Sequence, residues 1–187
     1  MRHSVWAIAH LSDASEAILR GLFHDKLGFP SKMIKRGLHT TIYHARRPLA
    51  GIADSEETIA ITVPGSELRM MALAPGGENA RPDVDPRLCL VGLRIRRAEG
   101  AANALEAMRA RFFAYETENV LGVRRPSSRR SSAFGARSYQ PHITVLKAGA
   151  IADPDLSKIG FIVRQQLTSL QFDRLVVRCR VHDVPNG

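Results

Sequence analysis

Runs of alternating apolar and polar residues, together with runs of β-branched residues, mark several short strands along the chain. A strand sends successive side chains to opposite faces, so such runs between turn residues are typical of a sheet. The pair Pro64 and Gly65 separates two of these runs and predicts a hairpin between them. The predicted strands are residues 5–11, 38–48, 58–63, 67–73, 87–96, 139–149 and 170–181.

A first segment with helical spacing follows the first predicted strand. Asp13 is placed to cap it while Glu16 reaches back three residues, and Gly28 and Pro30 stop it. The spacing predicts a helix over residues 14–27. Its apolar stripe consists of Ile18, Leu19, Leu22 and Phe23.

A second helix is predicted over residues 99–119, where apolar residues recur at steps of three and four and form one stripe for the core. Residues 121–138 have no period and collect Arg, Ser, Gly and Pro, which predicts a loop. The segment 153–167 fits either a short helix or a strand. The stripe of the second helix consists of Leu105, Met108, Phe112 and Tyr115.

Length and charge limit the class of protein. The 187 residues suit one domain with a substantial core, and a net charge of +9, from 27 Lys and Arg against 18 Asp and Glu, favours anionic partners. Cys89 and Cys179 lie in apolar stretches and indicate buried, reduced thiols, with a single disulfide as the alternative. The apolar run 5–11 is too short for a signal peptide or membrane span. We therefore expect a soluble, cytoplasmic protein without a membrane partner.

Two of the predicted strands contain the sequence H-x-T. His39 and Thr41 share one strand face, and so do His142 and Thr144. With seven histidines in the chain, about one H-x-[ST] is expected by chance. Both copies, however, use Thr, and both follow half a chain of similar element order. An imidazole therefore stands beside a hydroxyl twice, which packing alone explains poorly.

This pair of motifs resembles the signature of the two-histidine (2H) phosphoesterase superfamily, H-x-[TS]-x with a hydrophobic residue beside each copy. The superfamily includes RNA 2′,3′-cyclic phosphodiesterases, also called 2′-5′ RNA ligase-like proteins. Here the signature reads HTTI at residues 39–42 and HITV at 142–145, and YQP leads into the second copy. Two features depart from the pattern: Thr40, where an apolar residue is more common, and the long Arg/Ser loop.

The resemblance implies an α+β fold in which residues 1–187 form a single 2H phosphoesterase-like domain of two lobes. The lobes would be pseudo-symmetric antiparallel sheets around a central cleft, with helices on the outside. It also implies that His142 is the base that activates water and His39 the acid that protonates the leaving oxygen. The spacing of the motifs does not determine this direction.

Hydrolysis of a cyclic phosphodiester needs a base for the attacking water and an acid for the leaving alkoxide. Imidazole, with an ordinary pKa near ~6.5, serves as either at neutral pH. The hydroxyls of Thr41 and Thr144 are placed to donate hydrogen bonds to the phosphoryl oxygens. This chemistry requires no metal or other cofactor. The nearest acidic pair, Asp83 and Asp85, lies in a Pro-rich stretch and is not expected to bind a cation.

Further residues are candidates for substrate binding. Tyr43 is expected on the same strand face as His39 and Thr41, and Tyr139 precedes the second motif, although core packing is the favoured interpretation of both rings. His44 is an odd number of positions from His39 and is expected to be structural on the opposite strand face. The predicted loop carries arginines that suit phosphate and base recognition or, equally, a solvated face: Arg124, Arg125, Arg129, Arg130 and Arg137. The remaining histidines, His3, His10, His24 and His182, carry no functional assignment.

The leading functional hypothesis is a metal-independent phosphodiesterase whose partner is RNA or a nucleotide with a 2′,3′-cyclic phosphate, acting as a monomer. A hypothesis of another class is an RNA- or nucleotide-binding module without turnover, which would not need a matched acid and base. Within the enzymes, a 3′ exonuclease, a hydrolase of cyclic oligonucleotides and an RNA ligase remain alternatives. Sequence alone does not separate these activities.

Overall fold

The predicted strands form one antiparallel sheet. The computed structural model describes residues 2–45, 51–74, 85–96, 100–116, 139–150 and 156–182. Within them the fold is α+β, with seven strands in the order β3-β7-β1-β2-β6-β5-β4 and three α-helices. The strands are β1 (Arg2–Leu11), β2 (His39–Ala45), β3 (Ser55–Pro64), β4 (Leu68–Leu73), β5 (Leu90–Ile95), β6 (His142–Leu146) and β7 (Ser169–His182). The α-helices are α1 (Asp13–Gly21), α2 (Ala101–Glu116) and α3 (Leu156–Gln166).

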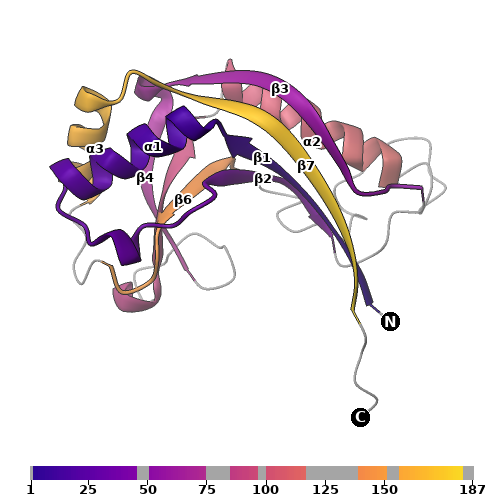
Figure 1. Ribbon diagram of the computed structural model, residues 1–187, viewed down its shortest axis with the longest axis horizontal. Coiled ribbons are helices and arrows are strands. Elements are labelled where there is room, and N and C mark those ends of the chain that lie inside the picture. Colours follow the sequence, from indigo (N-terminus) through magenta and orange to yellow (C-terminus); the bar gives the residue numbers. More distant parts are fainter. Residues whose placement is uncertain are drawn as a thin grey trace, which may run out of the picture.

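The predicted hairpin at Pro64 and Gly65 is wrong. Strands β3 and β4 are consecutive in sequence but occupy opposite edges of the sheet, where β3 pairs with β7 and β4 with β5. A short 3₁₀ turn, Gly65–Glu67, joins the two edges. The N–H of Gly65 donates to Thr168 O at 2.8 Å, and a Cβ on Gly65 would lie 1.8 Å from Leu167 O, so only glycine fits this crossing. Figure 1 shows the strong curvature of β3, β7, β1 and β2.

Helix α1 confirms the predicted helix but not its cap. Ser12, rather than Asp13, accepts the N–H of Ser15 on its side chain. The carboxylate of Glu16 reaches instead across to the segment before β2, where it accepts two backbone N–H groups. The chain continues past Gly21 as a π-helical turn, Leu22–Lys26. Glu16 therefore holds a loop next to the candidate motif rather than closing a capping box.

The other helices agree with or complete the prediction. Helix α2 lies within the predicted 99–119, and Leu105 and Phe112 of its stripe are buried. The ambiguous segment 153–167 contains α3. In the described part of the chain, no helix combines the length and apolar character needed to cross a membrane. Both cysteines are free thiols, Cys89 buried and Cys179 half-buried.

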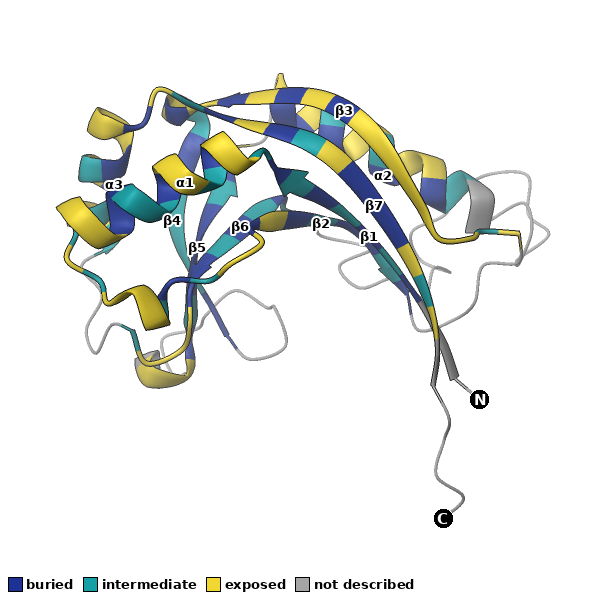
Figure 2. Ribbon diagram, viewed as in Figure 1, coloured by how far each residue is buried: buried dark blue, intermediate teal, exposed yellow. Residues whose placement is uncertain are grey.

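One face of the sheet carries the core. A row of residues paired across the strands is almost inaccessible to solvent: Leu175, Ala9, Thr40, Ile143 and Leu93. Helix α1 contacts β1 and β7, and α2 contacts β2 and β3. In the second half of β3, from Ile59 onward, buried and exposed positions alternate because one face of the strand is covered (Figure 2). The opposite sheet face, which carries the candidate residues, stays partly exposed.

Candidate active site

The two H-x-T motifs lie on neighbouring strands. Strands β2 and β6 are antiparallel and pair through Thr40 and Ile143, both buried. The residues on either side of this pair point to the opposite face of the sheet. Counting outward from it places His39 opposite Thr144 and Thr41 opposite His142. We call these four side chains the histidine face; they form a quadrilateral with the two imidazoles at diagonal corners.

Both imidazoles are oriented by the same hydrogen bond. Nδ1 of His39 lies 2.7 Å from Gly37 O, and Nδ1 of His142 lies 2.9 Å from Gln140 O. A carbonyl oxygen only accepts, so each Nδ1 carries a proton and donates it. Nε2 is then the nitrogen that gains or loses a proton on each ring. His39 is exposed and His142 is half-buried, so solvent reaches the two rings to different extents.

Side chains around the second motif join it to β2. The N–H of His142 donates to Thr40 Oγ1 at 3.2 Å, and the hydroxyl of Tyr139 donates to Thr41 O at 3.0 Å. The guanidinium of Arg109 lies 4.2 Å from the centroid of the Tyr139 ring. Burial raises the pKa of Tyr139 to about 12, although the charge of Arg109 opposes this rise. Tyr139 is therefore a protonated donor at neutral pH, and its contacts are those of a packed support.

A separate anchor holds the first motif. The carboxylate of Glu16 accepts the N–H of Gly37 at 2.9 Å and that of Leu38 at 2.8 Å. Gly37 has a φ of 62°, which favours glycine, and its carbonyl is the acceptor for His39. Two charge-assisted hydrogen bonds from α1 thus fix the peptide that orients His39.

Two charged or titratable side chains that sequence reasoning missed flank the histidine face. His10 pairs with His39 across β1 and β2, and the ring centroids are 5.6 Å apart. Burial lowers the pKa of His10, and the charges of His39 and Arg174 add to this effect. Arg94 pairs with His142 from the other side. Only the register of the strands brings these residues to the motifs, and no local sequence pattern signals it.

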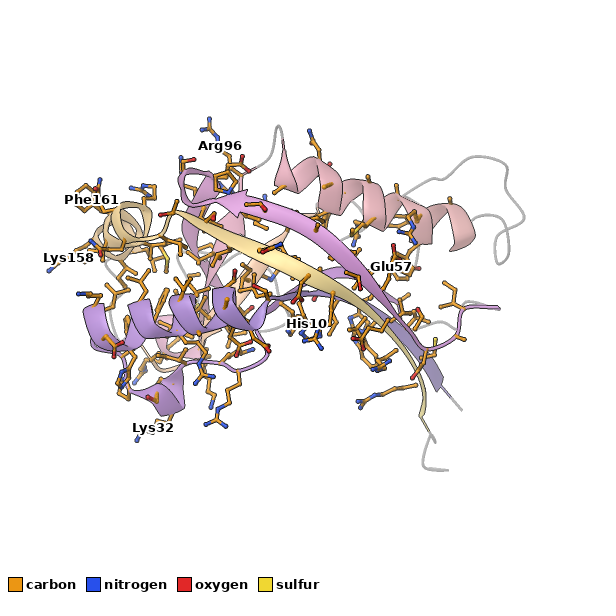
Figure 3. The ribbon with its side chains drawn as sticks, turned by 45° about the horizontal axis from the view of Figure 1, so that its top comes forward. His10, Lys32, Glu57, Arg96, Lys158 and Phe161 are labelled. Atoms are coloured by element: carbon orange, nitrogen blue, oxygen red, sulfur yellow. The ribbon has the colours of Figure 1, made fainter. Side chains whose placement is uncertain are left out.

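Figure 3, in which the side chain of His10 is labelled, shows this residue near the middle of the molecule. Strand β1 is enclosed by β7 and β2, so His10 has strands on both sides. Its cross-strand neighbours are Arg174 on β7 and His39 on β2. The side of the sheet that carries the histidine face therefore extends over β1 to β7, through His10 and Arg174.

A bulge in β2 overturns two predictions of facing. Ala7 pairs with Tyr43 and Ile8 with Thr41, so Ile42 is an extra residue in the ladder. Tyr43 therefore turns to the core, where it is 0% exposed and stacks on Phe112 at 5.4 Å, and it does not share a face with His39. The preferred interpretation of Tyr43 as a core ring is confirmed, whereas its assignment to substrate binding is wrong.

The same bulge brings His44 to the face of His39, against the prediction that it lies opposite. His44 pairs with Trp6, and the two rings stack with centroids 4.7 Å apart and an interplanar angle of 22°. Both side chains are half-buried. Strict alternation predicts facing only in a regular strand, and one inserted residue reverses it for every position that follows.

The remaining predicted substrate residues lie outside the described part of the chain: Arg124, Arg125, Arg129, Arg130 and Arg137. Asp83 lies outside it as well, and Asp85 pairs with Arg87 at 2.9 Å. Across the described ranges, no group of three or more His, Cys, Asp or Glu side chains is arranged to hold a metal ion.

Comparison with known proteins adds no family: no family model matches the chain, and no curated protein matches it significantly.

Proposed function

We propose that the protein is a phosphodiesterase that opens 2′,3′-cyclic phosphates on RNA ends or nucleotides without a metal ion. The observation that carries this proposal is the pairing of β2 with β6, which joins two His and two Thr side chains on one partly exposed sheet face. Each imidazole keeps its Nδ1 proton on a backbone carbonyl, so two exchangeable Nε2 atoms serve the same site.

The diagonal arrangement suits an in-line displacement. A phosphoryl group centred on the quadrilateral has His39 and His142 on opposite sides, where the attacking water and the leaving oxygen must be. One neutral Nε2 takes a proton from water as its oxygen bonds to phosphorus. The other, protonated Nε2–H gives its proton to the ribose oxygen as the P–O bond breaks. The products are a phosphate monoester and a free ribose hydroxyl.

The threonines occupy the other diagonal, beside the non-bridging phosphoryl oxygens. Hydroxyl donors at these positions stabilise the negative charge that builds on the oxygens in the transition state. Thr41 and Thr144 face the same side of the sheet as the imidazoles, which supports this role. The half-buried surroundings of Thr41, Thr144 and His142 strengthen such hydrogen bonds relative to those in water.

We further propose that the protein resembles the 2H phosphoesterases in mechanism, with His142 as the base and His39 as the acid. The same resemblance implies two pseudo-symmetric lobes around a cleft. The proposal also includes action as a monomer in the cytoplasm, which the free thiols of Cys89 and Cys179 suit because thiols stay reduced there. A net charge of +9 favours a polyanionic substrate.

Product analysis in excess EDTA tests the function. The protein is incubated with nucleoside 2′,3′-cyclic phosphates, RNA with a cyclic phosphate end, linear RNA and cyclic dinucleotides. We expect a single phosphate monoester from the cyclic phosphates and slower or no reaction with the others. Shortening of linear RNA alone would assign the site to a 3′ exonuclease, and cleavage of cyclic dinucleotides alone to a cyclic oligonucleotide hydrolase. Tight binding without turnover of any substrate would favour the binding module.

A further inference from the structure

A pair of arginines extends the cross-strand row of Thr41 and His142 beyond β6. Arg94 on β5 is directly opposite His142, and Arg69 on β4 is directly opposite Arg94. Side chains of directly opposed residues leave an antiparallel sheet on the same face. Both arginines are half-buried. The two side chains therefore share the partly exposed side of the sheet with the histidine face.

Neither guanidinium is neutralised within the described part of the chain. No Asp or Glu side chain there forms an ion pair with Arg94 or Arg69, and the side chain of Arg94 has no hydrogen-bond partner there. Arg69 donates from Nη1 to Ser66 O at 2.6 Å and to Leu68 O at 2.8 Å, which leaves Nε and Nη2 for a ligand. Like charges on directly opposed residues destabilise a sheet. The pair thus costs stability unless an anion binds to it.

The other flank of the histidine face is balanced by carboxylates. Arg174 on β7 lies in the cross-strand row of the first motif, 3.8 Å from Glu56 Oε1 and 3.6 Å from Asp173 Oδ1. Of the arginines in the two rows that contain the motif residues, only Arg94 and Arg69 lack such a partner among the described residues. In these rows, the unbalanced positive charge lies on the β5 and β4 side.

The position of the pair fits the next phosphate of an RNA strand. Adjacent strands are about 4.8 Å apart, so Arg94 lies roughly 7 Å from the centre of the quadrilateral, midway between β2 and β6. His142 lies between that centre and Arg94. The four motif residues surround the reacting phosphoryl group, and the arginines are placed for a second phosphate one ribose away. At an RNA end, this is the 5′-phosphate of the nucleotide that carries the cyclic phosphate.

We propose that Arg94 and Arg69 bind the 5′-phosphate of the nucleotide whose cyclic phosphate lies on the histidine face. The inference rests on the proposed function and deepens it, because it favours an RNA end or a 5′-phosphorylated nucleotide over a nucleoside cyclic phosphate with a free 5′-hydroxyl. A guanidinium binds phosphate oxygens through a fork of parallel N–H donors. The bound phosphate also relieves the repulsion between the two arginines.

Kinetics with two matched substrates test the subsite. Adenosine 2′,3′-cyclic phosphate is compared, in excess EDTA, with the same molecule carrying a 5′-phosphate. Arg94→Gln should raise KM about tenfold for the 5′-phosphorylated substrate, the scale of one lost charge-assisted hydrogen bond, and leave KM for the 5′-hydroxyl substrate unchanged. Arg69→Gln should raise the same KM severalfold. Arg94→Lys keeps the charge but loses the fork, so its KM should lie between those of wild type and Arg94→Gln.

Arg111→Gln is the matched control, because it removes the same charge at another place. Arg111 is exposed on α2 and lies 3.1 Å from Glu57, and its loss should leave KM for both substrates unchanged. Urea denaturation of Arg94→Gln provides a second readout. Removal of one of two opposed like charges should keep the free energy of unfolding at or above that of wild type. A marked loss of stability would show that Arg94 is bound within the protein and would contradict the subsite.

Binding separates the subsite from the proposed function. Isothermal titration calorimetry compares adenosine 3′,5′-bisphosphate with adenosine 3′-monophosphate. We expect wild type to bind the bisphosphate about tenfold more tightly and Arg94→Gln to lose this preference. An unchanged preference in Arg94→Gln, or equal KM changes for the two cyclic substrates, would overturn the subsite while leaving the phosphodiesterase intact. The expected preference in a protein that opens no cyclic phosphate would support the subsite and contradict the proposed function.

Discussion

The two H-x-T motifs have the same internal geometry and different surroundings. In each, Nδ1 of the histidine bonds to the carbonyl two residues before it, at 2.7 Å for His39 and 2.9 Å for His142. His39 is exposed and pairs with another imidazole, His10, whereas His142 is half-buried and pairs with Arg94. The motif thus sets the direction of the ring, and the neighbouring strand sets the charge around it.

The supports of the motifs differ as well. A carboxylate from α1, Glu16, holds the peptide before His39. The backbone of His142 is instead tied to β2 through Thr40. Equal motifs on unequal supports can take unequal roles, as an acid and a base must. Variants of one support at a time therefore separate the contributions of the two motifs.

The largest expected effect on kcat is that of removing the imidazole of His39 or of His142. His39→Ala and His142→Ala should each lower kcat by about 10² to 10⁴-fold for a nucleoside 2′,3′-cyclic phosphate, because each removes a general acid or base. His24→Ala, at an exposed histidine paired with Asp25, is the matched control and should keep wild-type kcat. Wild-type activity in either motif variant would remove that motif from the site.

The second-largest expected effect is that of removing either threonine hydroxyl of the two motifs. Thr41→Ala and Thr144→Ala should each cost about 2 to 4 kcal/mol of transition-state stabilisation, as removal of one oxyanion donor does. The loss is measured as the kcat/KM of each alanine variant relative to wild type. Serine at the same position keeps a hydroxyl and is expected to retain most of the activity. Thr58→Ala, an exposed threonine on β3, should have no effect. Full activity in both alanine variants would show that the hydroxyls do not contact the phosphoryl group.

Glu16 sharpens the comparison because it supports only the first motif. Glu16→Gln leaves one oxygen acceptor for two N–H groups and should lower the free energy of unfolding by about 1 to 2 kcal/mol. Urea denaturation measures this loss, and kcat should fall severalfold as His39 becomes less well oriented. Arg20→Gln removes only the 3.5 Å ion pair with Glu16 and should change stability by less than about 0.5 kcal/mol. If both variants behaved alike, Glu16 would not be an anchor.

The smallest expected effect is the response of stability to pH through His10. Burial first, then the charges of His39 and Arg174, lower the pKa of His10 below its ordinary 6.5, while Asp173 and Glu16 oppose this shift. The unfolded chain therefore binds more protons just below pH 6.5, and the free energy of unfolding falls as pH drops through that window. Urea titrations at several pH values should show a shallower fall in His10→Asn. An identical slope in the variant would mean that His10 does not titrate differently on folding.

Much of the fold follows from local sequence, but its connections do not. Alternation predicts the strands of the sheet because each has one buried face. The turn at Pro64 and Gly65 signals a reversal of the chain, yet it does not determine which strand the next strand pairs with. That choice depends on β7 and β5, which come later in the sequence and pair with β3 and β4.

The candidate site shows the same limit. Both H-x-T pairs are readable because residues two apart share a strand face. Strict alternation places Tyr43 and His44 on the wrong faces, because a bulge at Ile42 shifts the alternation. His10 could not be recognised, since only the register of β1 against β2 brings it to His39. Local patterns predict the chemistry of a strand, while its neighbours are set by tertiary pairing.

The most direct test of the central claim is the pH dependence of kcat/KM for a nucleoside 2′,3′-cyclic phosphate in excess EDTA. Catalysis by one neutral and one protonated imidazole predicts a bell over roughly pH 5 to 8, undiminished by the chelator. A metal-bound hydroxide would not need this pair of protonation states. Loss of activity in EDTA, restored by magnesium or zinc, would contradict the account even if both histidines proved essential.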